Sequence, residues 1–219
     1  VLLPWRRLRI RACGLMGWAL GWGVAWATGC SVFCKGNKLG RGQAPAIYIS
    51  NHTSWLDLFM CMWVAPIGTV AIGKKEILYY PVFGLLYVLS GHVWIDRSNK
   101  ERAVASLKRA AHFVGENHLS IFMWPEGTRS HDGRLQNFKK GLGHVAMATQ
   151  LPIVPIVVKG AHRATLLGPL PTRKNVIEIE FLPPVDISNW REETLGQHLD
   201  ELQAVMTSAL PEDQRPLVG

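Results

Sequence analysis

The chain has 219 residues, a formal net charge of +8 and four cysteines. This length favours one sizeable folded domain. The cysteines show no metal-ligand spacing, and three lie in or beside an apolar segment, which indicates small hydrophobic side chains in a reducing compartment. The charge does not indicate nucleic-acid binding, because residues 1–41 hold seven basic residues and no acid, while the remainder has 17 basic and 16 acidic residues.

The first element along the chain is an uncharged apolar segment from Ala12 to Phe33, which is long enough to span a bilayer. Small residues recur in it at every fourth position, a spacing that allows close helix packing in a membrane, and tryptophans form a neighbouring stripe. The small residues are Gly17, Gly21, Ala25 and Gly29, and the tryptophans are Trp18, Trp22 and Trp26. We expect a helical membrane anchor that lies in or dips into the surface, with a single span and a buried core helix as alternatives.

The sequence from 35 to 45 is rich in glycine and contains a proline, which is typical of a linker. We therefore divide the chain into a basic-flanked apolar anchor and linker at 1–41 and a folded domain at 42–219. No internal repeat or low-complexity tract interrupts the folded domain.

Short apolar runs alternate with helical patterns after residue 41. The runs lie at 46–50, 69–73, 92–96, 119–124, 152–158 and 176–182. A helix is predicted at 99–116, with Ser98 and Glu101 as a capping box, and leucines at helical spacing predict another near residues 195–206. This alternation predicts a single α/β domain with a largely parallel or mixed sheet flanked by helices.

A second stretch without charges runs from Ile77 to Ile95 and is interrupted by Pro81, Gly84 and Gly91. It fits a buried helix followed by a strand. It also fits a lipid-facing surface or the wall of an acyl-chain channel, and the sequence leaves both interpretations open.

Three of the predicted strands end in polar residues. The run at 46–50 leads into Asn51 and His52, the run at 92–96 leads into Arg97, and the run at 119–124 leads into residues 125–129. Ligands bind beyond the carboxyl ends of strands in open parallel sheets, so we expect these residues to gather at one edge as a candidate site.

His52 is the candidate general base, because imidazole titrates near neutrality and can accept a proton from an alcohol. Asp57 follows five residues later and can fix the imidazole tautomer if a helix starts near Ser54. The same spacing of Ser54 and Asp57 also fits a capping box, in which Asp57 only bonds the helix start.

The candidate anion-binding residues are Arg97 and Arg129, because arginine stays charged and makes bidentate bonds to phosphate. Gly127 would let the main chain approach a ligand, Thr128 adds a hydroxyl, and Glu126 either holds the arginines or bonds a substrate hydroxyl. Lys74 and Lys75 follow the second strand and either add positive potential or form an exposed loop pair. The sequence contains no nucleophile elbow, P-loop, dinucleotide fingerprint or H-E-x-x-H metal spacing.

Taken together, these motifs resemble those of glycerolipid acyltransferases, and most closely the 1-acylglycerol-3-phosphate O-acyltransferase (lysophosphatidic acid acyltransferase) family. NHTSWLD at 51–57 resembles the N-H-x₄-D motif, and GHVWIDRS at 91–98 resembles the second block. MWPEGTRS at 123–130 is similar to the third block, F-P-E-G-T-R-S, with Trp124 where phenylalanine is usual. LPIVPIVVKG at 151–160 resembles the fourth block, and the order of the blocks matches.

The resemblance implies an acyltransferase domain at 42–219 that moves an acyl chain from a thioester to the free hydroxyl of lysophosphatidic acid, giving phosphatidic acid. His52 would be the general base and Asp57 its charge partner. The substrate-binding residues would be Arg97, Glu126, Gly127, Thr128, Arg129, Lys74 and Lys75.

The resemblance further implies no cofactor and no metal, with acyl-CoA or acyl carrier protein as co-substrate. The expected partners are membrane lipids and a lysophospholipid acceptor, and the expected location is a membrane surface, the cytoplasmic face of the bacterial inner membrane. The alternatives are an acyltransferase for another lysolipid such as lyso-ornithine lipid, a hydrolase, and a non-catalytic lipid-binding protein.

Overall fold

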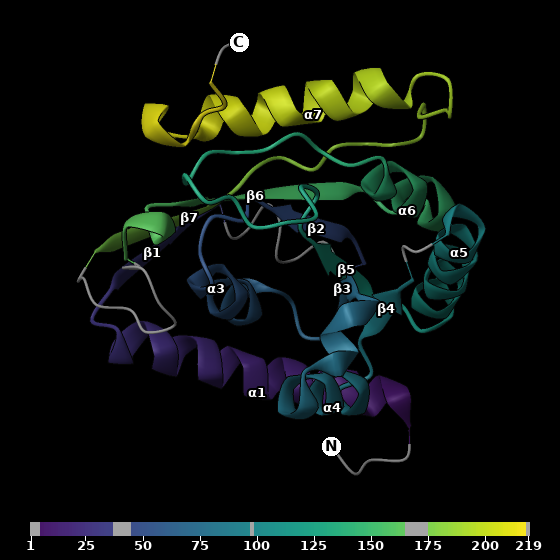
Figure 1. The fold of residues 1–219 in the computed structure, drawn as a ribbon, viewed down its shortest axis with the longest axis horizontal. Coiled ribbons are helices and arrows are strands. Elements are labelled where there is room, and N and C mark those ends of the chain that lie inside the picture. The colour runs from purple at the N-terminus through teal and green to yellow at the C-terminus, as the bar shows by residue number, and fades with distance from the viewer. Residues whose placement is uncertain (1–4, 37–44, 97–98, 165–174, 218–219) are drawn as a thin grey trace.

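A seven-stranded sheet runs through the middle of the molecule, with helices on both of its faces (Figure 1). The computed structural model describes residues 5–36, 45–96, 99–164 and 175–217. The strands lie in the order β1-β7-β6-β2-β5-β3-β4. Their bounds are β1 Ser31–Lys35, β2 Ile47–Ser50, β3 Thr69–Lys74, β4 Val93–Ile95, β5 Ser120–Met123, β6 Ile153–Lys159 and β7 Val176–Phe181.

All neighbouring strands are parallel except β6 and β7, which pair antiparallel. The sheet is therefore mixed, and the predicted α/β class is confirmed. The six predicted strands correspond to β2 through β7, each within a residue or two of the expected bounds.

The helices and short 3₁₀ turns connect these strands in chain order. Their bounds are α1 Arg6–Ala27, α3 Leu56–Val64, η1 Lys75–Tyr79, α4 Pro81–Leu89, α5 Lys100–Glu116, α6 Gly141–Thr149, η2 Ala161–Ala164, α7 Leu195–Ala209 and η3 Glu212–Gln214. The cap of α5 is Asn99, whose Oδ1 accepts the main-chain N–H groups of Glu101 and Arg102, at 2.7 and 3.2 Å. The predicted cap Ser98 lies outside the described residues, and the observed cap follows it by one position.

Each central strand buries both of its faces, because successive side chains of a strand point to opposite sides. In β2, Ile47 and Ile49 face a core formed with α5, α6 and α7, while Tyr48 faces a second core formed with α3 and the end of α1. The predicted stripe of Leu195, Leu199, Leu202 and Met206 on α7 is buried in the first core.

The apolar segment from Ala12 to Phe33 is not one helix. It contributes the last part of α1, a turn at residues 28–30 and the start of β1, which pairs with β7 at the edge of the sheet. Three residues of the small-residue stripe, Gly17, Gly21 and Ala25, are buried inside the domain, and Gly17 and Gly21 lie against Met62 and Trp63 of α3. Gly29 is exposed in the turn after α1. No helix within the described part of the chain combines the length and apolarity needed to cross a membrane.

The predicted division at residue 41 places α1 and β1 in a separate segment. In the structure both of these elements pack against the rest of the molecule. Strand β1 belongs to the same sheet as the other strands, and α1 is tied to the region before β4. The guanidinium of Arg6 donates from Nε to the Gly91 carbonyl at 2.9 Å and lies 4.0 Å from the Phe113 ring centre. Most of the predicted linker lies outside the described residues, since positions 37–44 are not described.

Candidate active site

The candidate site lies where β2 and β5 end side by side. These two strands are parallel neighbours, with Ile47 opposite Ile121 and Ile49 opposite Met123. Asn51 and His52 follow β2 directly, and residues 124–130 follow β5. The topology therefore brings two of the predicted polar clusters together at the carboxyl edge of the sheet.

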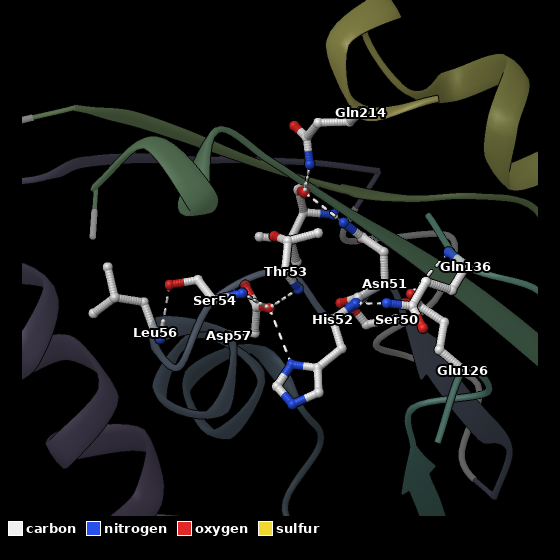
Figure 2. A network of polar contacts seen from close by, with 11 residues as sticks. Ser50, Asn51, His52, Thr53, Ser54, Leu56, Asp57, Glu126, Gln136 and Gln214 are labelled. Atoms are coloured by element: carbon white, nitrogen blue, oxygen red, sulfur yellow. Dashed lines mark hydrogen bonds and ion pairs between the residues drawn. The ribbon is translucent and has the colours of Figure 1, made fainter. Parts of the chain in front are cut away.

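Asp57 holds the turn that carries His52. Its Oδ2 atom lies 3.2 Å from Nδ1 of His52 and accepts the main-chain N–H groups of Thr53 and Ser54, at 2.6 and 2.7 Å (Figure 2). Ser54 Oγ in turn accepts the N–H of Leu56, at 3.2 Å. The carboxylate is fully buried in the first turn of α3, so one oxygen atom both closes the helix start and orients the imidazole.

The loop after β5 holds the main chain of His52 from the other side. Glu126 Oε1 accepts the His52 N–H at 2.7 Å, and the Ser130 N–H donates to the His52 carbonyl at 2.8 Å. The other carboxylate oxygen of Glu126 accepts the N–H of Gln136 at 2.9 Å. Glu126 is completely buried, and this burial raises its pKa to about 7 against the opposing effect of the two main-chain donors.

Asn51 and Gln214 anchor the same turn to β6. The side-chain amide of Asn51 donates to the Val158 carbonyl at 2.9 Å and accepts the Val158 N–H at 2.8 Å. Gln214, from η3 near the C-terminus, donates to the same carbonyl at 3.2 Å and accepts the Gly160 N–H at 2.9 Å (Figure 2). Both residues are fully buried.

Trp124 stacks on the imidazole of His52, which sequence reasoning did not anticipate. The ring centres are 4.3 Å apart and the planes are inclined by 17°. The edge of the Trp124 indole meets Phe122 at 5.2 Å, with planes at 80°. The only sequence signal was the tryptophan in place of the usual phenylalanine of the third block.

His52 is thus fixed by its main chain, by Nδ1 and by one ring face. Its Nε2 atom makes no hydrogen bond to any residue in the described ranges, and the side chain is partly exposed. This atom is available to exchange a proton with a bound alcohol.

The predicted binding residues next to this imidazole form the surface of the loop after β5. Gly127 has a φ of 75°, a left-handed conformation that glycine adopts without strain, and Thr128 and Arg129 are exposed. The Thr128 hydroxyl lies 3.4 Å from Gln136 Oε1.

The remaining predicted cations are less well placed in the structure. Lys75 forms an ion pair with Asp96 at 3.1 Å, which raises the pKa of Lys75. Arg97 and the side chain of Lys74 lie outside what the structure describes. Within the described ranges, no group of three or more histidine, cysteine, aspartate or glutamate side chains is arranged to hold a metal ion.

Comparison with known proteins identifies the family. A family model described as "Acyltransferase" matches residues 31–159, more than half of the chain. The chain belongs to this acyltransferase family. The matched range runs from β1 to β6, so α1, η2, β7, α7, η3 and the residue Gln214 lie outside it.

Similar sequences carry one shared description. The "1-acyl-sn-glycerol-3-phosphate acyltransferase" of Cocos nucifera is 43% identical over the whole of this chain and 70% of its own length. The protein of the same description from Escherichia coli K12 is 32% identical over 84% of this chain and 74% of its own length.

A solved structure shares the fold. The crystal structure of the 1-acyl-sn-glycerophosphate (LPA) acyltransferase PlsC from Thermotoga maritima superposes with a TM-score of 0.73. The match covers 92% of this chain and 80% of that chain at 22% identity.

Proposed function

We propose that this acyltransferase transfers a fatty acyl chain from an acyl thioester to the free hydroxyl of lysophosphatidic acid, forming phosphatidic acid. The observation that carries the proposal is the 3.2 Å contact between His52 Nδ1 and Asp57 Oδ2 at the carboxyl end of β2. The shared description of the relatives supports the choice of acceptor.

His52 acts as the general base through Nε2. It removes the proton of the acceptor hydroxyl as that oxygen attacks the thioester carbonyl carbon, and a C–O bond forms. The C–S bond then breaks, and the proton on Nε2 passes to the departing thiolate. General base catalysis of this kind typically contributes about 10²–10⁴-fold to the rate.

Asp57 holds the imidazole with Nδ1 protonated and stabilises the positive charge that develops as Nε2 takes up the proton. Since a thioester is already an activated acyl group, the transfer can proceed by direct attack without a covalent intermediate on the protein. No cofactor enters this scheme, and the thioester is carried by coenzyme A or by acyl carrier protein.

The phosphate of the acceptor binds at the loop after β5, where Gly127, Thr128 and Arg129 reach the surface beside His52. The sequence motifs assign Arg97, Lys74 and Lys75 as further cations for the phosphate, and of these the structure describes the side chain of Lys75, which is paired with Asp96. Binding the phosphate away from the reacting atoms orients the hydroxyl toward Nε2.

Glu126 positions the residues that contact the substrate and does not contact the substrate itself. Both of its oxygens accept main-chain N–H groups, one from His52 and one from Gln136, and the residue is fully buried. Glu126 therefore couples the position of the base to the position of the phosphate-binding loop, instead of bonding the acceptor itself.

The enzyme acts at a membrane surface, because both the acceptor and the product are membrane lipids. Exposed apolar side chains of α1 and of the η1–α4 region support this location. They include Leu15, Met16, Trp18, Leu20, Trp22 and Trp26 on α1, Tyr79 on η1, Tyr80 between η1 and α4, and Leu85 and Leu86 on α4. Arg7 and Arg11, also exposed on α1, fit an anionic lipid surface.

An acceptor panel tests the proposed reaction. The purified protein is given acyl-CoA or acyl carrier protein thioester together with lysophosphatidic acid, with lyso-ornithine lipid, or with no acceptor. We expect phosphatidic acid as the main product. Acylation of lyso-ornithine lipid alone would show that the acceptor is not lysophosphatidic acid. Fatty-acid release without any acceptor would identify a hydrolase. Lipid binding without turnover would indicate a non-catalytic protein.

A further inference from the structure

The stack between Trp124 and His52 places an indole face against the ring that must become positively charged. Its centre-to-centre distance of 4.3 Å and inclination of 17° lie within the range in which an aromatic face attracts a cation. Tryptophan has the most strongly attracting face among the aromatic side chains.

Taking the proposed general-base role of His52 as its premise, we propose that Trp124 is a positioning residue that stabilises the imidazolium form of His52 through its indole face. The interaction strengthens as Nε2 takes up the hydroxyl proton, because a neutral imidazole gains less from the aromatic quadrupole than an imidazolium does. The stabilisation is therefore larger in the transition state than in the ground state, which is the condition for a rate effect.

The other supports of His52 leave this ring face to Trp124. Asp57 contacts the ring nitrogen Nδ1, while Glu126 and Ser130 bond only the main chain of His52. The indole and the carboxylate thus act on the same charge from two directions.

The indole is itself fixed in place. Its edge-on contact with Phe122 and its packing beside the core between the sheet and α3 restrict its rotation. The main-chain carbonyl of Trp124 accepts the Gly127 N–H at 3.1 Å, which ties the stack to the turn of the phosphate-binding loop.

Among the residues that the structure describes, four titratable groups lie near the His52 ring or interact with Asp57, its ion-pair partner. Asp57 of α3 contacts His52 directly, and Glu126 comes from the loop after β5. Cys61 of α3 and His162 of η2 interact electrostatically with Asp57. A substitution at Trp124 replaces none of these groups. Glu126, whose pKa is raised to about 7, titrates in the same range, so the shift of the acid limb is measured in the Glu126→Gln background as well, where it reports on the stack.

The test is the pH profile of acyl transfer by Trp124→Phe and Trp124→Leu. Without the indole face the imidazolium is less stable, so the base stays neutral at lower pH. For Trp124→Leu we expect the acid-side half-maximal pH to move down by about 0.5–1 unit. We also expect kcat to fall about 3–10-fold at the plateau, with an unchanged KM for the acceptor. Trp124→Phe should fall between this variant and the unsubstituted protein.

The matched control is Trp190→Leu. Trp190 also stacks on a histidine, His198, with ring centres 5.2 Å apart and planes inclined by 2°, but this pair lies by α7. The substitution should lower stability without moving the acid limb. An unmoved limb in Trp124→Leu, or a rise in KM alone, would overturn the proposal.

Trp124→Phe keeps an aromatic ring in the same place, so the same comparison remains available if the leucine variant does not fold. A phenylalanine variant with the pH profile of the unsubstituted protein would then overturn the proposal. A separate result would show that His52 is not the general base: the His52→Ala variant would then retain acyl transfer. An inactive His52→Ala together with an unmoved limb would reject only the role of Trp124.

Discussion

At the scale of single residues, Asp57 does two jobs with one oxygen atom. Sequence spacing left open whether it closes a helix start or orients His52. The structure shows both contacts on Oδ2, since the main chain at 51–55 folds back over the first turn of α3. The two jobs can be separated by substitution, because only one of them needs a negative charge.

Asp57→Asn keeps a carbonyl oxygen for the N–H groups of Thr53 and Ser54, whereas Asp57→Ala leaves both donors buried and unpaired. We expect Asp57→Ala to lower the free energy of unfolding by about 2 kcal/mol or more, and Asp57→Asn to lower it less. Both variants should lose about 10²–10⁴-fold in turnover, because neither carries the charge that stabilises the imidazolium. Urea unfolding and acyl-transfer rates measure the two effects, and near-normal turnover of Asp57→Asn would contradict the charge role.

Glu126 gives the molecule a pH dependence of known sign. Its pKa is raised from 4.5 to about 7, so the folded state binds the proton more tightly than the unfolded state. The resulting stability is fully present below pH 4.5 and is lost as the pH rises through 7. By itself this group would lower the free energy of unfolding by up to about 3 kcal/mol over that range.

His92 opposes this trend, since burial lowers its pKa from 6.5 to about 4 and its contribution to stability rises with pH over that interval. The prediction therefore compares the free energy of unfolding as a function of pH for two proteins, the unsubstituted protein and Glu126→Gln. The free energy of unfolding of Glu126→Gln should rise relative to that of the unsubstituted protein between pH 4.5 and 7. Urea titrations across that range measure the difference, and parallel curves would mean that Glu126 is not buried as the structure shows.

At the scale of elements, most strands were predictable because each is a short apolar run followed by glycine, proline or polar residues. Strand β1 was missed because Val32 and Phe33 continue the apolar composition of α1. A stop signal was present at Thr28 and Gly29, where Gly29 has a φ of 65°. Composition outweighed that signal in the sequence-based interpretation.

The small residues of α1 were expected to pack closely against another helix. The structure shows that this partner helix is α3 of the same domain. Gly21 fits so closely on α3 that a Cβ there would lie 2.7 Å from Trp63 Cβ and closer still to the Phe59 carbonyl oxygen. Sequence spacing reveals the stripe but not the partner, because α3 lies more than thirty residues away.

The stripe predicts opposite effects for two neighbouring glycines. Gly21→Ala should lower the free energy of unfolding by about 1–3 kcal/mol through overpacking. Gly23→Ala is the matched control, because nothing lies within 4 Å of its added Cβ, and it should be neutral or stabilising by up to about 1 kcal/mol. Chemical unfolding compares the two, and equal effects would place α1 away from α3.

The turn that carries His52 was predictable in part, because it follows a predicted strand. His52, Asp57 and the loop at 126–129 were found from local spacing and strand ends. Gln214 and Trp124 were not, because Gln214 reaches Val158 from 56 positions away and the ring stack depends on how β2 and β5 pair.

At the scale of the whole molecule, α1 and α4 lie together on one side of the sheet and α7 lies on the other (Figure 1). Cys13 of α1 contacts Ser90, the residue after α4, at 2.9 Å, so the two helices lie next to each other. The uncharged stretch from Ile77 to Ile95 combines strand β4, whose Val93 and Ile95 are buried, with helix α4, on which Leu85 and Leu86 are exposed. Contact of this helix with lipid stays a prediction.

This arrangement predicts which face meets lipid. Trp22→Glu places a charge on the exposed side of α1 without touching its contact with α3. We expect it to reduce co-flotation with anionic liposomes severalfold, with the fold retained by circular dichroism. Val205→Glu, at an exposed apolar position of α7, is the matched control and should bind as before. Equal binding of the two variants would move the membrane-facing surface elsewhere.

The catalytic role of His52 is tested most directly by the rate of phosphatidic acid formation from lysophosphatidic acid and an acyl thioester. The measurement compares the unsubstituted protein with His52→Ala after both are shown to be folded. We expect the unsubstituted protein to form phosphatidic acid and His52→Ala to lose at least about 10²-fold in turnover. Near-normal turnover of folded His52→Ala would contradict the assignment of His52 as the general base.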